Sequence, residues 1–84
     1  MTVTRDLAGL NDALVEVLRE FLPAPVTPAL RRTFGEALER VAGEFVEDFM
    51  VDVEPRGKLA AAVAYTDPDD PEEVKVIWIQ HGKP

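Results

Sequence analysis

The residues of this chain that are most able to do chemistry lie in one short acidic segment. Asp67-Pro-Asp-Asp-Pro-Glu-Glu73 carries five carboxylates. Hard cations such as calcium bind clusters of oxygen ligands. An EF-hand loop, however, needs a glycine at its sixth position and a glutamate at its twelfth, and this segment has neither. Its two prolines also restrict how the carboxylates can converge. We therefore predict a solvated hairpin loop and no metal site.

The single histidine, His81, is the natural candidate for a general base at neutral pH. Asp52 or Glu54 could approach it across a sheet, but no spacing requires that contact. A general base also needs a nucleophile or a substrate beside it. The chain has no serine and no cysteine, and it contains no phosphate loop, dinucleotide fingerprint or zinc spacing. We predict no catalytic residue, no cofactor and no enzymatic activity.

A basic segment, Pro55-Arg-Gly-Lys58, separates two stretches of alternating hydropathy. Its glycine can adopt a positive φ, which favours a tight turn. The main-chain and side-chain groups of such a turn can hold one anion. Turns of this composition are common, however, so we interpret the segment as a connection between strands.

The charge balance is acidic, with 16 acids against 9 bases and a net charge of −7. A phosphate backbone repels such a chain, so we expect no direct nucleic-acid binding. An array of carboxylates can instead imitate a phosphate backbone and block a nucleic-acid-binding protein. The candidates for this mimicry are Glu36, Glu39, Glu44, Glu47, Asp67, Asp69, Asp70, Glu72 and Glu73. The alternative is a solvated surface that maintains solubility, and Arg31, Arg32 and Arg40 interrupt the array in a way that favours it.

The length of the chain, 84 residues, predicts a single domain over residues 1–84. Without cysteine, neither a disulfide nor a thiolate metal site can supplement so small a core. Stability must then come from packing, within one chain or against a second subunit. No apolar run is long enough to span a membrane, and the start of the chain does not resemble a signal peptide. We expect a cytoplasmic protein with no membrane partner.

Hydrophobic residues in the first half recur at steps of three and four, which predicts two helices, at about 4–22 and about 28–46. Thr4 is a candidate N-cap of the first. Thr27 can cap the second, because Pro28 then takes the first helical position. Leu38 and Val41 should lie at the centre of the core. Gly43 could mark the close approach of another element.

From Phe49 onward the hydrophobic period is two, which predicts strands at about 48–54, 59–66 and 74–81. Short connections favour an antiparallel β-meander. The sequence therefore predicts an α+β fold with two layers, in which two antiparallel helices pack on a three-stranded antiparallel sheet in the order ααβββ.

The third strand is apolar on both faces. Val76 and Trp78 share one face, and Ile77 and Ile79 share the other. Helices on one side of a sheet cover only one of these pairs. Trp78 could lie flat over the alanine row that includes Ala62 and shield it within the monomer. Alternatively, the uncovered face binds another protein or a second copy of this chain.

We interpret the chain as a small acidic protein–protein interaction module that forms a homodimer and is non-catalytic or regulatory. The interface residues expected from this hypothesis are Val76, Trp78, Ile77, Ile79 and Ala62. Repulsion between two acidic copies should exclude the acidic loop from the contact and make the dimer tighter as salt rises. The alternatives are a nucleic-acid mimic and a small enzyme or ligand binder whose site forms at a subunit interface.

Overall fold

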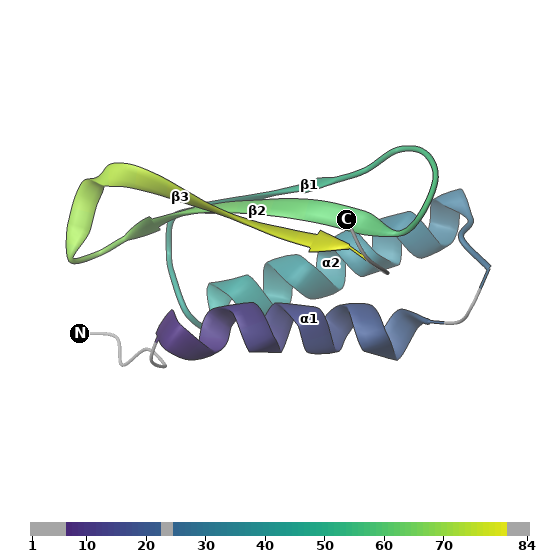
Figure 1. Cartoon of the computed structure of the whole chain (residues 1–84), viewed down its shortest axis with the longest axis horizontal. Helices are drawn as coiled ribbons and strands as arrows, with labels where there is room; N and C mark the ends of the chain where they lie inside the picture. Colours follow the sequence, from purple (N-terminus) through teal and green to yellow (C-terminus); the bar gives the residue numbers. More distant parts are fainter. Residues whose placement is uncertain (1–6, 23–24, 81–84) are drawn as a thin grey trace.

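A computed structural model describes residues 7–22 and 25–80. In this part of the chain, two helices are followed by a three-stranded antiparallel sheet with the strand order β1-β2-β3 (Figure 1). Both helices lie on the same side of the sheet. The predicted two-layer α+β fold of the order ααβββ is therefore confirmed.

The first helix, α1, spans Leu10–Phe21 and follows a 3₁₀ turn at Leu7–Gly9. The α-helix begins later than the periodicity suggests, because the tighter i→i+3 turn occupies the preceding residues. Its proposed cap, Thr4, lies outside the described residues. The buried stripe is the predicted one, with Leu10, Leu14, Val17 and Leu18 facing the core.

The second helix, α2, spans Pro28–Gly43. Thr27 caps it as predicted: the Thr27 Oγ1 accepts the main-chain N–H of Leu30 at 3.0 Å, and proline follows at the first helical position. The helix ends three residues before the expected position. Phe45 and Val46 donate instead to the carbonyl oxygen of Ala42 in a turn, which directs both side chains into the core.

The strands are β1 (Phe49–Val53), β2 (Ala60–Asp67) and β3 (Asp70–Gln80). The predicted loop over residues 67–73 is wrong in extent, because the hairpin turns through only Pro68 and Asp69 and β3 begins at Asp70. Between the pairs Thr66–Val74 and Asp67–Asp70 the register shifts, and residues 71–73 have no partner in β2. Proline is tolerated there because an unpaired position on an edge strand requires no ladder donor.

The core lies between the helices and the inner sheet face. Leu38 is fully buried, as predicted, whereas Val41 is only half-buried, so its predicted central position is wrong. Val41 lies toward the side of α2 that faces solvent, one residue from the buried Ala42. The buried residues of the sheet layer that pack in this core are Ala61, Val63 and Ile79 on the strands and Leu59 directly before β2.

Candidate interaction surface

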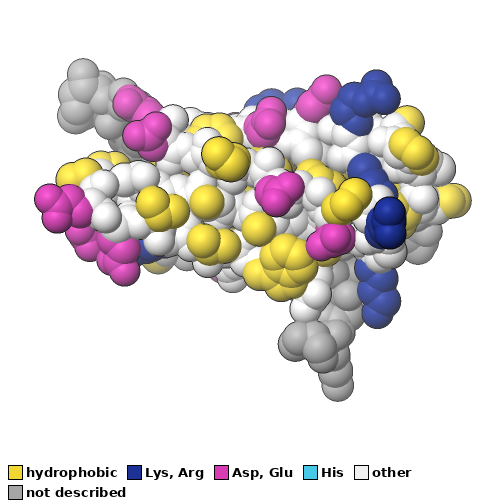
Figure 2. All heavy atoms as spheres, turned by 90° about the horizontal axis from the view of Figure 1, so that it is seen from above, with side chains coloured by type: hydrophobic (Ala, Val, Ile, Leu, Met, Phe, Trp, Pro, Cys, Tyr) yellow, Lys and Arg dark blue, Asp and Glu magenta, His cyan; other side chains and the backbone are white. Residues whose placement is uncertain are grey.

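The sheet face turned away from the helices carries the largest exposed apolar side chains of the described chain. They are Met50 at 69%, Val74 and Val76 at 63%, and Trp78 at 51% of full exposure. We call the surface formed by these four residues, together with Ala62 and Ala64 of the central strand β2, the outer sheet face. Figure 2 looks down on it and shows apolar side chains along its length. Large apolar side chains are usually buried, and a contiguous exposed patch of them commonly marks a binding site, so this face is a candidate interface.

Strand register arranges the outer sheet face in rows. Met50, Ala64 and Val76 form one row across the three strands, and Asp52, Ala62 and Trp78 form the next. The central strand contributes only alanine to both rows, so no large neighbour on β2 covers the indole of Trp78. Ala62 is half-buried beside it. Half of the tryptophan surface therefore stays exposed although the ring adjoins the alanine row.

The structure decides which apolar pair of β3 faces the helices. Ile79 is 1% exposed within the core, and the half-buried Ile77 packs against that core. The hypothesis that these two isoleucines form the contact is therefore wrong. Ile79 lies opposite Ala61 of β2 and Ile77 lies opposite Val63. Residues directly opposite each other on neighbouring strands share a face, so both isoleucines face the helices.

Charge is separated along the molecule. At the end with the β2–β3 turn lie eight acids of the described chain: Glu44, Glu47, Asp48, Asp67, Asp69, Asp70, Glu72 and Glu73. The opposite end holds the β1–β2 loop, the end of α1 and the start of α2. Five of the seven basic residues that the structure describes lie there, with the acids Glu20 and Glu54 among them: Arg19, Arg31, Arg32, Arg56 and Lys58. Figure 2 shows the two groups at opposite ends of the outer sheet face.

A single arginine fixes the β1–β2 loop. Arg31 of α2 donates from Nη1 to the carbonyl oxygen of Glu54 and from Nη2 to that of Gly57, both at 2.8 Å. Gly57 adopts a φ of 73°, as expected for this turn. The guanidinium donates hydrogen bonds to two carbonyl groups of the loop, which holds its positive charge at this end of the molecule. Arg31 is separated from Glu54 by 23 positions and from Gly57 by 26 positions in the sequence. No local sequence pattern links residues so far apart, so the sequence did not reveal this contact.

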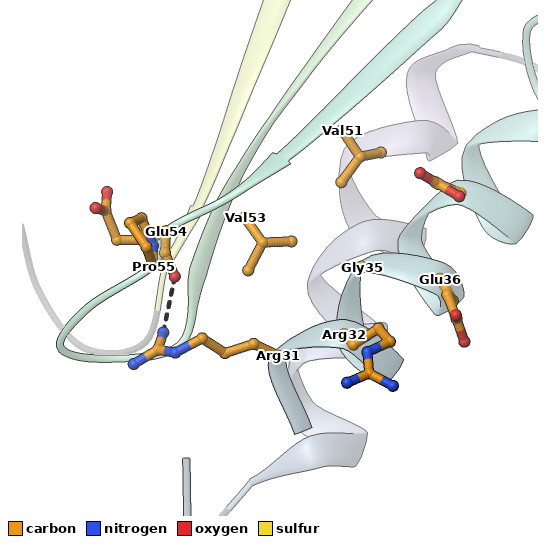
Figure 3. Close-up of a pocket in the computed structure, with 9 residues that line it drawn as sticks. Arg31, Arg32, Gly35, Glu36, Val51, Val53, Glu54 and Pro55 are labelled. Carbon is orange, nitrogen blue, oxygen red and sulfur yellow. Dashed lines mark hydrogen bonds between the residues drawn. The ribbon is translucent and has the colours of Figure 1, made fainter. Parts of the chain in front are cut away.

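Arg31 also borders a groove of about 490 Å³ between α2 and β1. Val51 and Val53 of β1 and Gly35 of α2 line it, and Arg32 and Glu36 flank it (Figure 3). The groove opens at the β1 edge, where no further strand of the described chain is paired. It combines an apolar lining, charged borders and an unpaired strand edge.

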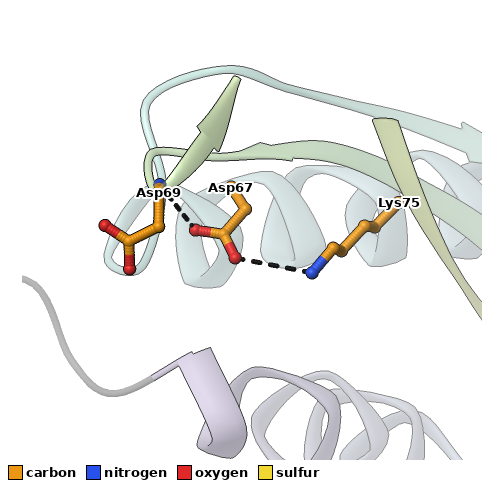
Figure 4. A network of polar contacts seen from close by, with 3 residues as sticks. All are labelled: Asp67, Asp69 and Lys75. Atoms are coloured by element: carbon orange, nitrogen blue, oxygen red, sulfur yellow. Dashed lines mark hydrogen bonds and ion pairs between the residues drawn. The ribbon is translucent and has the colours of Figure 1, made fainter. Parts of the chain in front are cut away.

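The acidic hairpin uses its first carboxylate for local structure (Figure 4). Asp67 Oδ1 accepts the main-chain N–H of Asp69 at 2.9 Å, and its Oδ2 lies 3.5 Å from Lys75 Nζ. The hydrogen bond and charge of Asp67 raise the pKa of Lys75 above its ordinary value. Within residues 7–22 and 25–80, no three His, Cys, Asp or Glu side chains are grouped so that they could hold a metal ion.

Two further sets of candidates from the sequence are the single histidine and the acids of α2. His81 lies outside the described residues. The helical acids proposed for mimicry, Glu36 and Glu39, share the exposed surface of α2 with Arg32 and Arg40, so α2 presents mixed charge. Among the described helices, none is both long and apolar enough to cross a membrane.

Comparison with known proteins adds no relative. The chain matches no protein-family model, no curated protein and no solved structure.

Proposed function

We propose that the protein is a homotypic interaction module whose outer sheet face binds a second copy of the chain. The observation that carries this proposal is the line of exposed Val74, Val76 and Trp78 along β3, with the exposed Met50 on the same face of β1, across Ala64 of β2. Tryptophan is enriched at the energetic centres of protein interfaces. Burying these side chains removes apolar surface from water, which is the main driving force of protein association.

Charge separation supports a second copy as the occupant and selects one orientation. Two stacked sheets related by a two-fold axis that runs across the strands point in opposite directions. Centred on Val76, this arrangement places the acidic hairpin of one copy, including Asp70, over the basic loop of the other, including Lys58. An axis along the strands would instead place acid over acid. An axis across the strands also places β1 over β1 of the other copy, so Asp52 of one copy faces Asp48 of the other at the side of the contact. The opposite charges that favour this orientation are therefore those at the two ends of the sheet.

Contact through the face is favoured over pairing of the β3 edges. Edge pairing would leave the outer sheet face of both copies exposed. The start of β3 also opposes it, because Pro71 and the unpaired acids beside it interrupt a regular ladder. Strands of 5, 8 and 11 residues, eight on average, give a face of roughly 14 by 26 Å. Two such faces total roughly 700 Å², below the usual size of a stable specific interface, so we expect a weak and readily reversible dimer.

The orientation reverses the salt dependence expected from net charge. At about 0.1 M ionic strength the Debye length is about 10 Å, shorter than the sheet, so each charge interacts mainly with the charges that face it. Because the facing charges are opposite, raising the salt concentration further should weaken the dimer.

Sedimentation velocity over a range of concentrations tests the proposal. The parent should dimerise, and Trp78→Glu should be a folded monomer. Thr33→Glu adds the same charge on the exposed surface of α2 and should dimerise like the parent. A parent that stays monomeric up to millimolar concentration would exclude the dimer, as would a Trp78→Glu variant that dimerises like the parent.

A charge exchange tests the orientation. Lys58→Glu and Asp70→Lys should each weaken the dimer. The double variant should recover affinity, because in a two-fold dimer it restores an opposite pair at both contacts. If the two single effects simply add in the double variant, the antiparallel orientation is wrong even if Trp78 lies in the interface.

A further inference from the structure

We propose that the open edge of β1, together with the groove beside α2, binds an extended peptide segment of a partner protein, in which Lys or Arg alternates with small apolar residues. The peptide joins the sheet as a fourth strand. This site lies at the edge of the sheet and does not depend on dimerisation through the outer sheet face.

The main-chain groups of β1 show which residues can receive a strand. Glu54 donates to the carbonyl oxygen of Ala60 at 2.8 Å, and Thr66 donates to that of Asp48 at 3.0 Å. These bonds flank β1 at both ends. In an antiparallel ladder, pairs that exchange hydrogen bonds alternate with pairs that do not. The register is continuous between them, so the N–H and C=O groups of Phe49, Val51 and Val53 point away from β2.

The groove receives the side chains on one side of such a strand. Residues of the added strand whose side chains point to the same face of the sheet as Val51 and Val53 would lie over the apolar lining of the groove (Figure 3). Gly35 lies close to Val53 and adds no side chain that would cover the two valines. Both valines are only half-buried, so apolar side chains of a peptide would cover surface that is still wet. Valine-sized residues suit this side because the groove is open and shallow.

The other side of the added strand lies next to acids. Asp48, Asp52 and Glu54, on β1 or directly beside it, alternate with the valines and belong to the opposite face of the sheet. All three are exposed. Side chains directly opposite each other on neighbouring strands lie about 4.5–5.5 Å apart between Cβ atoms. Lys or Arg at alternate positions of the peptide would therefore be paired with carboxylates at three of the four positions on this side, the fourth being the exposed Met50. Charge and hydropathy together specify a strand in which basic and apolar residues alternate.

A second copy of β1 does not fit this edge. Two-fold pairing of β1 with itself allows three registers in which at least two of the outward residues Phe49, Val51 and Val53 are paired. These registers place Asp48 against Asp52, Asp48 against Glu54, or Asp52 against its own copy. Each one opposes like charges directly across the ladder, which is destabilising. The edge therefore favours a foreign basic segment.

A capped seven-residue peptide that alternates lysine and valine serves as the probe, with binding followed by isothermal titration and by main-chain amide shifts. It should bind and shift the amides of β1 and of α2 around Gly35. A glutamate–valine peptide of the same length should not bind. The decisive comparison uses two N-methylated versions of the lysine–valine peptide. One carries the methyl groups on the amides that would face β1, and the other carries them on the amides that would face solvent. One methylated peptide should bind like the parent, and the other should lose about tenfold or more in affinity. Equal binding of the two would show attraction by charge alone and would overturn the proposal.

Two variants test the edge from the protein side. Val51→Pro removes an outward N–H and leaves the β1–β2 ladder intact, so it should abolish peptide binding. Val76→Pro is the matched control for peptide binding alone, since Val76 lies in the proposed dimer contact. Strand β3 alternates in the same way, and the Val76 N–H points away from β2 at the opposite edge. If Val51→Pro does not fold, Asp52→Lys should weaken peptide binding, whereas Asp12→Lys on α1 should not. Sedimentation of Val51→Pro separates the two proposals, because the variant should lose the peptide and keep the dimer. Peptide binding unchanged in Val51→Pro or Asp52→Lys would exclude the site.

Discussion

Gly35 of α2 lies so close to Val53 of β1 that a Cβ atom on the glycine would stand 3.0 Å from Val53 Cγ2. Such a separation is shorter than ordinary van der Waals contact. The helix therefore approaches the edge strand at a position that only glycine fits without displacement. The close approach expected at Gly43 is found at Gly35, since a Cβ on Gly43 would meet Phe49 at an ordinary 3.8 Å.

The two glycines give a matched pair of stability predictions. Alanine is favoured over glycine in a helix by about 0.8–1 kcal/mol. Gly43→Ala should retain part of this gain, because its new methyl group has room. Gly35→Ala should lose all of it, because overpacking costs about 1–3 kcal/mol. Urea unfolding of both variants checks the order. A more stable Gly35→Ala than Gly43→Ala would contradict the close contact.

Arg31 should stabilise the β1–β2 loop more than its neighbour does. Arg31→Met removes two hydrogen bonds to main-chain oxygens while keeping much of the side-chain volume. We expect a loss of about 1–3 kcal/mol in the free energy of unfolding, because hydrogen bonds from a charged donor are the stronger kind. Arg32→Met, at an exposed position with the same charge change, should stay within about 0.5 kcal/mol of the parent. Equal effects of the two changes would mean that the loop needs no anchor.

Leu38 should be far more sensitive to truncation than Val41. Leu38 is fully buried, so Leu38→Ala should cost about 2–5 kcal/mol, a large part of the stability of a small domain. Val41→Ala removes less volume at a half-buried site and should cost clearly less. Denaturant melts of both variants measure the difference. A loss below about 0.5 kcal/mol for Leu38→Ala would place the helical stripe elsewhere.

Stability should decline at alkaline pH as Lys75 loses its proton. Asp67 raises the folded-state pKa of Lys75 above 10.5 through a hydrogen bond and charge, and Glu73 and Tyr65 act in the same direction. A raised pKa in the folded state means that the contribution is complete below pH 10.5 and is lost as the pH rises through the folded value. Comparing the pH dependence of unfolding in the parent, Lys75→Met and Asp67→Asn isolates this contribution. Both variants should show a shallower alkaline decline, and a decline equal to that of the parent would exclude the pair as its source.

The sequence predicts local structure well where one physical signal dominates. Thr27 and Pro28 specify the start of α2, and the change of hydrophobic period before Phe49 separates helices from strands. The face of β3 that meets the helices was not predictable, because Ile77 and Val76 are equally suited to burial. Only register with the buried Ala61 and Val63 of β2 decides it.

Other features depend on contacts between distant residues. Asp70, Pro71 and the glutamates after them have the composition of a loop, yet the tight turn at Pro68 and Asp69 brings Asp70 into pairing with Asp67. The β1 groove needs Gly35 and Val53 to meet, although 18 positions separate them in the sequence. Composition and periodicity report on neighbours in sequence, so neither could reveal these contacts.

The separation of acids and bases between the two ends of the molecule has a kinetic consequence. At about 0.1 M ionic strength, two copies that come within about a Debye length would turn before they touch, because each end then interacts mainly with the end that faces it. In the proposed dimer, such steering would act on the rate of association, whereas burial of Trp78 would act on the rate of dissociation. Substitutions at Lys58 should therefore change how fast dimers form, and substitutions at Trp78 should change how long each dimer lasts.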